Sequence, residues 1–498
     1  MTRDIVLGLD IGTTSTIATA VRLPGTILAV ASRPVTLSSP HPGWAEEDPH
    51  QWWTNSVAVL REVVSQIDVN AIAGICTTGM LPAVVLLDDT GAVLRPSIQQ
   101  SDGRCGAEVD ELKLELDGAA FLARTGNGLN QQLVAAKLRW IRRHEPQVHA
   151  AIATVFGSYD YINWRLTGTR AVEQNWALEA GFTNLATDTI DDQLVALAGI
   201  PRSAVPPRSV SHEQMGTVSA AAARETGLPP GLPVFGGAAD HIVSALGAGI
   251  SRAGDVLLKY GGAGDIVVAT DRPIPDSRLY MDYHLVPGLY APNGCMASSG
   301  SALNWLAGLI TPDATNVRPH AQLDELAATI APGADGLTCL PYFLGEKTPI
   351  HDPLARGTFV GLSLSHTRAH LWRALLEAVA FGFRHHIDVL RDIGHEPRRY
   401  VASDGGTNSR VWMQITADVL GAPVTTMDNA HGSSVGAAFV AAIGVGLAKD
   451  WADISSLSKP GITFQPDPAA HRAYETGYAR YRRLYETLAP YFAAFNAH

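Results

Sequence analysis

The chain has 498 residues, of which 46% are hydrophobic and 17% are charged. That length exceeds one ordinary hydrophobic core, so two domains of an ordered globular protein are expected and a disordered chain is excluded. The formal net charge of -11 argues against a nucleic-acid partner, because an extended phosphate backbone needs clustered Lys and Arg side chains.

The four cysteines lie far apart and form no CxxC pair, which favours reduced thiols over a disulfide framework or a zinc site. The chain opens directly into a strand pattern, without a basic segment followed by an apolar one. It also contains no run of about 18 apolar residues. We therefore expect a cytoplasmic protein with no membrane partner.

The opening stretch predicts two strands, residues 5–9 and 17–21, joined by a polar turn. The turn residues that could reach a phosphate are Gly12, Thr13, Thr14 and Ser15. Backbone N–H groups and hydroxyls at such a turn can bind phosphate oxygens. Asp10, at the end of the first strand, would then hold a metal ion, since a hard cation prefers carboxylate oxygen. The alternative is an ordinary hairpin with a polar turn.

Strand and helix patterns alternate from this hairpin to about residue 245, which indicates an α/β fold. The expected elements are helix 50–66, strands 71–77 and 83–87, and helix 134–143. An Ala/Gly-rich helix, 239–249, is the expected hinge, because small residues tolerate changes in backbone dihedrals. We place the domain boundary in this helix, which gives domains 1–246 and 247–498.

The second half repeats the opening pattern in residues 256–269, which read as strand, glycine-rich turn and strand. Two such hairpins suggest a duplicated fold that holds one polyphosphate from both sides. Further on, the sequence predicts a long helix over 367–387, two strand–turn–helix units over 401–438 and a final helix over 469–494.

Two more glycine-rich turns are expected at strand–helix junctions, one at Gly236-Gly-Ala-Ala-Asp-His241 and one at Ser403-Asp-Gly-Gly-Thr-Asn-Ser409. Glycines let a nucleotide approach the backbone, and helix N-termini favour its negative charge. Together with the opening turn, they predict nucleotide binding. The chain has no G-x-x-x-x-G-K-[ST] motif and no G-x-G-x-x-G after the first strand, so neither a P-loop nor a dinucleotide fold is indicated.

Asp240 is the candidate general base, because it follows a glycine turn at the start of the hinge helix, where partial desolvation would raise its basicity. The alternative is an ordinary helix N-cap. A competing motif, Gly432-Ser-Ser-Val-Gly436, matches the nucleophile elbow of α/β-hydrolases, with Asp450, Asp453 or Asp467 and then His471 following in triad order. The small residues that continue it favour close helix packing instead.

Four segments resemble the FGGY family of carbohydrate kinases, and its xylulokinase-like members most of all. They are LGLDIGTTST at the start, the loop PGWAEEDPHQWW, GGAADHIVSALGAG around Asp240, and SDGGTNSRVWMQITADVLGAPV from Ser403. The segment from Gly357 to Glu377 fits the family's C-terminal signature. The segment around Lys137 fits the N-terminal signature, except at Gln132 and Val134. The likeness spans nearly the whole chain in the family's order.

The resemblance implies two ribonuclease-H-like domains of the actin and hexokinase type, with the sugar held mainly by the first half and ATP between the halves. It implies Mg²⁺ on Asp10, phosphate contacts from Thr13 and Thr14, and Asp240 as the base that deprotonates the sugar hydroxyl. The second-half residues that it assigns to the nucleotide are Gly261, Gly262, Gly405, Gly406 and Asn408. The reaction would be phosphoryl transfer by positioning and charge neutralisation.

The substrate positions depart from the family pattern. Met80 and Leu81 stand where Met and His usually contact the ketose, so the histidine is absent. Asp102 and Arg104 are kept, but Gln100 replaces the tryptophan that precedes them. Lost polar contacts change which hydroxyls can be satisfied. D-xylulose is therefore the first expectation. The alternative is another ketose such as ribulose, or a polyol such as erythritol, and glycerol fits less well.

Two further departures concern the phosphate turns: Ile17 stands where a basic residue is common, and Gly261-Gly-Ala-Gly264 replaces Gly-Thr-Ser-Gly. A different class of function also shares the fold, namely an actin-like ATP-binding switch or a pseudokinase. The presence of Asp240 argues against a pseudokinase. Since dimers are common among related kinases, a homodimer is a hypothesis for this chain.

Overall fold

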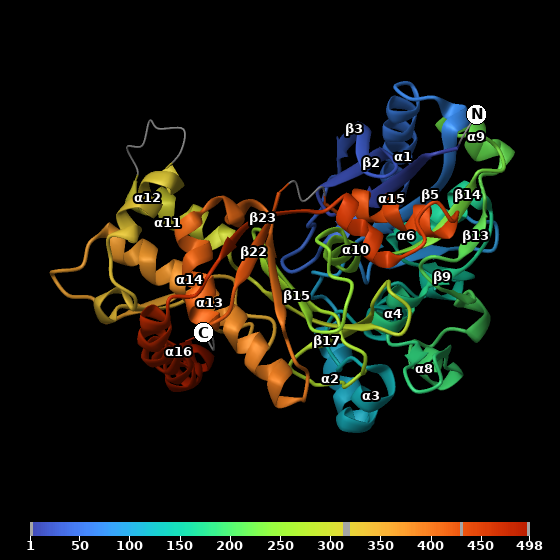
Figure 1. Ribbon diagram of the computed structural model, residues 1–498. Helices are drawn as coiled ribbons and strands as arrows, with labels where there is room; N and C mark the ends of the chain where they lie inside the picture. The colour runs from blue at the N-terminus through green and yellow to red at the C-terminus, as the bar shows by residue number, and fades with distance from the viewer. Residues whose placement is uncertain (1–2, 312–318, 429–431, 496–498) are drawn as a thin grey trace. The chain divides into compact units, whose positions relative to one another are not determined.

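A computed structural model describes residues 3–311, 319–428 and 432–495, and these divide into two units (Figure 1). The first unit comprises Met1–Ser251, Arg272–Ala291 and His431–Ser458. The second comprises Arg252–Asp271, Pro292–Ala430 and Lys459–His498. The expected boundary at residues 246 and 247 stays a prediction, but the chain enters the first unit twice more after that point.

The first unit is built on a six-stranded sheet in the order β13-β14-β5-β1-β2-β3. Its strands are β1 (Ile5–Ile11), β2 (Ser15–Arg22), β3 (Thr26–Pro34), β5 (Ile72–Gly79), β13 (Gln214–Thr217) and β14 (Pro233–Ala239). β1 pairs antiparallel with β2 and parallel with β5, and β5 pairs parallel with β14. The predicted opening hairpin is therefore confirmed. Every residue of β1 and β5 is buried.

The central strands of the second unit follow the order β18-β16-β15-β21-β22-β23. They are β15 (Asp255–Tyr260), β16 (Gly264–Val268), β18 (Tyr290–Met296), β21 (Arg399–Ser403), β22 (Val424–Asp428) and β23 (Lys459–Phe464). Three strands form an antiparallel meander and the next two add in parallel, as they do in the first unit. This repeated topology confirms the predicted duplicated α/β fold.

Helices cover the first sheet, and one of them comes from far along the chain. α1 (Pro49–Val64) packs on β2 and β3, while α15 (Gly432–Gly444) packs on β1 and β5. Figure 1 shows the orange α15 among the blue strands that begin the chain. The other helices of this unit are α2 (Gly106–Glu115), α3 (Gly118–Thr125), α4 (Val134–His144), α5 (Pro146–Ala150), α6 (Ser158–Thr167), α7 (Gln174–Glu179), α8 (Asp192–Ala196), α9 (Ala220–Thr226) and α10 (Asp240–Gly247).

The short strands of the first unit are β4 (Glu46–Glu47), β6 (Val85–Leu87), β7 (Ser97–Ile98), β8 (Thr154–Phe156), β9 (Val172–Glu173), β10 (Thr183–Asn184), β11 (Thr189–Ile190), β12 (Arg208–Ser209) and β17 (Tyr280–Tyr283). The predicted strand 83–87 is shorter than expected, because it forms only as β6. The predicted helix 134–143 is α4, with Trp140 buried and Arg143 exposed as expected from its periodicity.

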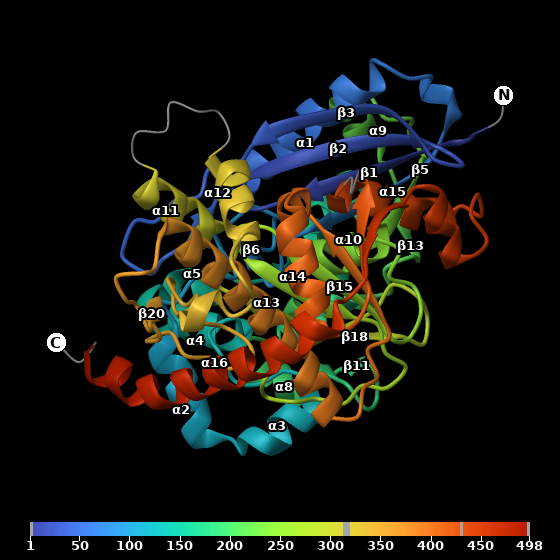
Figure 2. The same cartoon turned by 60° about the vertical axis from the view of Figure 1, so that its left-hand side comes forward.

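The second unit carries α11 (Gly300–Ile310), α12 (Pro319–Ala328), α13 (Arg368–Asp392), α14 (Arg410–Leu420) and α16 (Pro468–Phe495), and the short strands β19 (Thr338–Leu340) and β20 (Thr358–Val360). α14 packs against both α13 and α16. Figure 2 shows the red α16 extending toward the C-terminus. The predicted helix 367–387 is confirmed as α13 and continues to Asp392.

The glycines before Asp240 do not form the predicted turn. Gly236 and Gly237 lie inside β14, where the register against β5 shifts. Gly237 has a φ of +86°, and a Cβ there would lie 2.1 Å from the carbonyl oxygen of Thr77. The backbone therefore kinks within the strand rather than after it, and only glycine fits. The sequence pattern missed this because a bulge and a turn both require glycine.

No helix in the ranges that the structure describes combines the length and the apolar composition needed to cross a membrane.

We expect Gly8→Ala to destabilise the first unit severely. A Cβ on Gly8 would lie 1.7 Å from the carbonyl oxygen of Ser434, so strand and helix would have to separate. Overpacking typically costs about 1–3 kcal/mol, and a backbone clash of this kind belongs at or above the upper end. The urea midpoint of unfolding measures the loss. Gly118→Ala, where the added Cβ meets nothing within 4 Å, is the control; equal midpoints in the two variants would contradict the packing argument.

Candidate functional site

The first set of candidate residues surrounds the opening hairpin. Asp10 is 7% exposed near the end of β1, and its Oδ2 accepts a hydrogen bond from the Ser433 hydroxyl of α15. The turn that follows, Gly12 to Ser15, is open to solvent at Thr14. Thr13 Oγ1 donates to the Met80 sulfur over 3.6 Å. The predicted phosphate turn and the predicted substrate residue Met80 are thus brought together.

Asp10 and its neighbours fit a magnesium ion. Carboxylate and hydroxyl oxygens are the donors that this hard cation prefers, and Mg²⁺ is commonly held by one or two carboxylates together with water and phosphate oxygens. Asp10 and Ser433 supply such oxygens beside an exposed turn of backbone N–H groups. Ile17 faces Asp10 across the hairpin, so the position expected to be basic is apolar here.

The predicted base lies at the first residue of α10. The N-cap of this helix is Ala239, so the alternative of Asp240 as an ordinary N-cap is wrong. The Asp240 side chain is 37% exposed, and its Oδ1 lies 3.5 Å from Nδ1 of His241. Position at a helix N-terminus stabilises a carboxylate through the helix dipole. Asp240 is thus accessible to a substrate.

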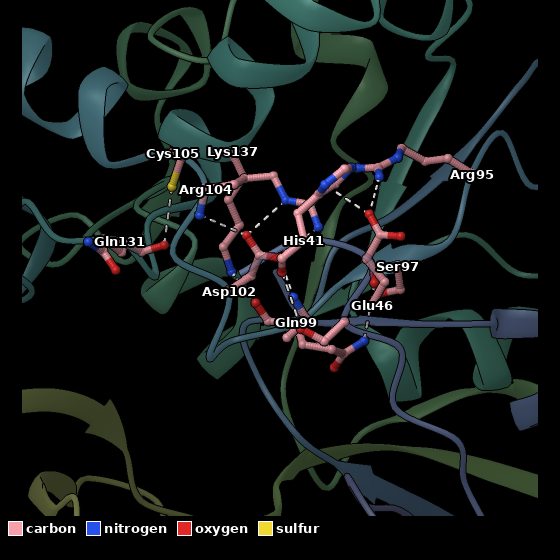
Figure 3. Close-up of polar contacts among 12 residues, drawn as sticks. His41, Glu46, Arg95, Ser97, Gln99, Asp102, Arg104, Cys105, Gln131 and Lys137 are labelled. Carbon is pink, nitrogen blue, oxygen red and sulfur yellow. Dashed lines mark hydrogen bonds and ion pairs between the residues drawn. The ribbon is translucent and has the colours of Figure 1, made fainter. Parts of the chain in front are cut away.

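Asp102 and Arg104 form a buried ion pair, drawn in Figure 3. The Arg104 guanidinium donates to both Asp102 oxygens and also pairs with Glu46 at 2.7 Å. It stacks on the Trp44 ring at 3.8 Å. Both side chains of the pair are fully covered by their neighbours. In this arrangement they bind the loop of Trp44 and Glu46 to the segment that carries Gln100.

Lys137, at the centre of the same network, is fully buried. Its Nζ donates to the carbonyl of Gln99 at 2.8 Å and to that of Pro82 at 3.3 Å. Burial lowers the pKa of Lys137 to about 8. The neighbouring Cys105 and Asp102 have the opposite, smaller effect on this pKa. The lysine therefore fastens the segment after β5, with Met80 and Leu81, to the segment before Asp102.

Gln100 and Gln132, two positions that depart from the family pattern, contact each other beside this network. The Gln132 side-chain amide donates to Oε1 of Gln100 over 3.1 Å. Both side chains are half-buried. Gln132 also lines a hollow of about 10 Å³ together with Glu179 of α7, Asn127 and Tyr280. A polar pair thus stands where the family pattern has an aromatic ring.

The second unit contains a pocket of about 910 Å³. It is lined by every second-half residue that the sequence assigned to the nucleotide, namely Gly261, Gly262, Gly405, Gly406 and Asn408. The turn after β15 and the loop after β21 therefore meet, as expected for two glycine-rich turns at the carboxyl ends of parallel strands. The volume lies within the range of small-molecule sites.

Asp404, at the rim of this pocket, has a backbone conformation that non-glycine residues rarely adopt, with φ 73° and ψ -176°. Such strain costs on the order of 1–3 kcal/mol and concentrates at functional sites. Lys259 Nζ lies 3.9 Å from carboxylate oxygens of both Asp404 and Asp265. A lysine is thus held beside the glycine turn that the sequence assigned to phosphate.

The comparisons with known proteins agree with this arrangement. The family model "FGGY family of carbohydrate kinases, N-terminal domain" matches residues 5–247, and the model of the C-terminal domain matches residues 262–445. The chain belongs to the FGGY family of carbohydrate kinases. It is therefore a phosphotransferase with an alcohol group as acceptor, and ATP binding is expected of it as of the family.

Among its relatives, a xylulose kinase from Rhodospirillum rubrum has a crystal structure that matches this FGGY kinase with a TM-score of 0.94. The two chains are 66% identical, and the match covers 98% of this chain and 100% of that one. The xylulose kinase of Klebsiella pneumoniae is 30% identical over 98% of both chains. The xylulose kinase of Staphylococcus epidermidis is 28% identical, with 98% of this chain and 97% of the relative covered.

The hydrolase alternative does not fit this FGGY kinase. Ser434, the nucleophile that the motif would require, is 4% exposed inside α15, and its hydroxyl hydrogen-bonds to that of Thr19 at 2.8 Å. A nucleophile elbow instead presents its serine on a sharp strand-to-helix turn. The small residues after Gly432 serve helix packing, as the second interpretation held.

Several residues around the candidate site could not be recognised from the sequence. Glu179 and Asp282 lie within 4.8 Å of His241, yet more than 40 positions separate each from that histidine. The pocket of the second unit is also lined by His320, Asp324, Trp372 and Trp412. These side chains sit in ordinary helical patterns, so their only distinguishing signal is tertiary contact. His241 alone had a local signal, because it adjoins Asp240.

We expect Arg104→Ala to cost about 3–5 kcal/mol, the range for breaking a buried ion pair and leaving one charge without its partner. Burial by itself would raise the pKa of Asp102, but the hydrogen bonds from Arg104 and Ala45 hold it below its usual value. This depressed pKa adds stability at neutral pH that is lost as the pH falls from about 4, the unfolded value, through the folded one.

Urea unfolding of wild type and Arg104→Ala at pH 7 and at pH 3.5 checks both statements. The difference in the free energy of unfolding between wild type and Arg104→Ala should be large at pH 7 and smaller at pH 3.5. Arg33→Ala is the control, because Arg33 pairs with Glu62 on the surface and its loss should cost less than about 1 kcal/mol. A cost for Arg104→Ala no greater than that of the control would contradict the argument.

Proposed function

We propose that this FGGY kinase transfers the γ-phosphate of Mg·ATP to a hydroxyl of D-xylulose. The observation that carries the proposal is the 66% identity to the Rhodospirillum rubrum xylulose kinase over 98% of this chain. The accessible Asp240 at the start of α10 supports it, since the reaction needs a base for the acceptor hydroxyl. A cytoplasmic location and a homodimer stay predictions.

In this reaction Asp240 accepts the proton of the attacking hydroxyl while the oxygen bonds to the γ-phosphorus and the bond to ADP breaks. Mg²⁺, when bound, would neutralise charge on the phosphate oxygens. Asp10 would hold it, with the Ser433 hydroxyl fixing that carboxylate from behind. Backbone N–H groups and hydroxyls of Thr13 and Thr14 would contact the phosphates. Groups fixed in this way would be in place before the reaction, which is the main source of catalysis in phosphoryl transfer.

The nucleotide would occupy the pocket of the second unit. Its walls offer what ATP requires: aromatic rings of Trp372 and Trp412, and glycine backbone at Gly261 and Gly405. Glycine without a side chain lets phosphate oxygens reach the main chain. Lys259, held between two aspartates, would add positive charge beside the turn that lacks the family's Thr and Ser.

We infer two different roles for the residues that were predicted to bind the sugar. Met80 contacts Thr13 of the phosphate turn, and Leu81 is 7% exposed beside it. We propose that these two, with Gln100, face the sugar, whereas Asp102 and Arg104 position this segment from within the protein. Direct sugar contacts of Asp102 and Arg104 stay a prediction. The alternative substrate is another ketose such as ribulose, or a polyol such as erythritol, because Leu81 cannot donate the hydrogen bonds of a histidine.

Asp240→Asn should lower kcat by about 10²–10⁴-fold, the usual contribution of a general base, while ATP affinity stays unchanged. A coupled ADP-release assay with D-xylulose, ribulose, erythritol, glycerol and sugar acids measures the first quantity. Nucleotide titration measures the second. Xylulose-dependent turnover that the variant retains would refute the role of Asp240. Rapid ADP release without any sugar would favour the actin-like switch instead.

Gln100→Ala and Gln132→Ala should each raise the KM for the sugar, and the double variant should show less than the product of the two effects. The reason is that each substitution already breaks the same hydrogen bond, worth about 0.5–1.5 kcal/mol. A double-mutant cycle on kcat/KM for D-xylulose and ribulose measures the coupling. Strictly multiplicative effects would show that the pair does not act on the sugar as a unit. The KM for ATP should not change.

A further inference from the structure

A chain of ionisable groups leads from Asp240 into the first unit. Nδ1 of His241 lies 3.5 Å from Oδ1 of Asp240, and Nε2 of the same ring lies 2.9 Å from Oδ2 of Asp282 in β17. Glu179, the last residue of α7, completes the group, because its carboxylate lies within 4.8 Å of both His241 and Asp282. One imidazole therefore bridges the proposed base and a carboxylate from a strand more than 40 positions away.

The inner end of this cluster is rigid. Asp282 is completely buried, and the residues on both sides of it are fastened by side-chain amides. Asn127 exchanges two hydrogen bonds with the backbone of Met281, at 2.9 and 3.0 Å. Asn175 accepts from the backbone N–H of Tyr283 at 2.7 Å. The Asp282 carboxylate thus has a fixed position, and its hydrogen bond to His241 fixes the imidazole ring in turn.

The charges around the imidazole favour its protonated form. Asp240 faces it from its own helix, Asp282 from β17 and Glu179 from α7, while Lys137 and Tyr159 lie behind the two carboxylates. Burial alone would lower the pKa of His241, but its hydrogen bonds to Asp240 and Asp282 raise it well above the usual value. Burial, and then the charge of Asp282, raise the pKa of Glu179 well above its usual value. Glu179 is therefore neutral, and the imidazolium of His241 lies between two carboxylates, those of Asp240 and Asp282.

We propose that His241 is a positioning residue for Asp240, held by Asp282 as a fixed cation that orients the Asp240 carboxylate and keeps it ionised. The proposal rests on the role of Asp240 as the base. An imidazolium at this distance lowers the pKa of a carboxylate, so Asp240 stays ready to accept a proton at lower pH than an isolated carboxylate would. The cation itself transfers no proton. It keeps both ring protons, on Nδ1 toward Asp240 and on Nε2 toward Asp282, while Asp240 takes the proton of the acceptor.

The pH profile of kcat/KM tests this role. Removing the cation in His241→Gln should raise the pKa of Asp240, so the acid limb should move to higher pH by about one unit, together with a lower kcat. Asp282→Asn should reproduce the shift, because the imidazole loses its counter-charge, whereas Asp282→Glu, which keeps the charge, should restore most of the wild-type profile. His50→Gln is the matched control: His50 is an exposed residue near the start of α1 and should leave the profile unchanged.

A lower rate in His241→Gln with an unshifted acid limb would reduce His241 to a structural residue and overturn the proposal. A second readout does not depend on activity. In ¹⁵N-labelled wild type, the His241 ring should titrate well above about 6.5, the ordinary histidine value, and Asp282→Asn should lower it. An ordinary pKa in wild type would overturn the proposal even if the variants fail to fold. Activity retained in Asp240→Asn would instead refute the proposed base while leaving the ring titration as it is.

The same three ligand atoms would also suit a transition metal, and the experiment separates the two cases. Dialysed wild type and Asp282→Asn are titrated with Zn²⁺ alone. Stoichiometric binding to wild type that raises its melting temperature and is lost in the variant would make the cluster a metal site and overturn the proposal. Absence of such binding supports the hydrogen-bonded cation.

Discussion

The contact between Gly8 of β1 and the first turn of α15 determines where both candidate carboxylates lie. With no side chain on Gly8, the helix backbone approaches the strand closely enough for Ser433 to reach Asp10 and for Ser434 to reach Thr19. The same helix packs against α10, whose first residue is Asp240. One close approach between two segments at opposite ends of the sequence thus fixes the strand that carries one carboxylate and the helix that carries the other. Flexibility at this point would blur both positions, and phosphoryl transfer depends on position.

Inside the first unit, several buried ionisable groups are held by partners of opposite charge or by more than one hydrogen bond. Arg104 is placed between Asp102 and Glu46, Lys137 among carbonyl oxygens, and His241 between Asp240 and Asp282. A buried charge without such partners would be costly, so each of these side chains depends on the groups that surround it. Such sets hold side chains in defined positions, which would suit the region that we propose binds the sugar.

The sequence was a good guide wherever a local pattern has a single structural meaning. The alternation of strand and helix, the two glycine hairpins and the long amphipathic helix of Arg368–Asp392 were all predicted, because periodicity and turn chemistry are properties of short segments. The pocket of the second unit was predicted to the extent that its glycines recur in two loops. Prediction failed where one residue type serves two geometries. Gly236 and Gly237 form a bulge instead of a turn. The partners of His241 and the burial of Arg104 follow only from tertiary contacts, which no local pattern encodes.

The place of α15 in the chain also has a consequence during synthesis. Asp10 and Ser433 are 423 positions apart, so the strand that holds Asp10 leaves the ribosome long before the helix that covers it. At about 5–20 residues per second, roughly 20–85 s pass between the two events. Throughout that interval the apolar face of β1 and β5 lacks its helix, and the second unit is being made in the meantime. A nascent chain of this kind has a prolonged period of exposed hydrophobic surface, in which a chaperone would have its main opportunity to bind.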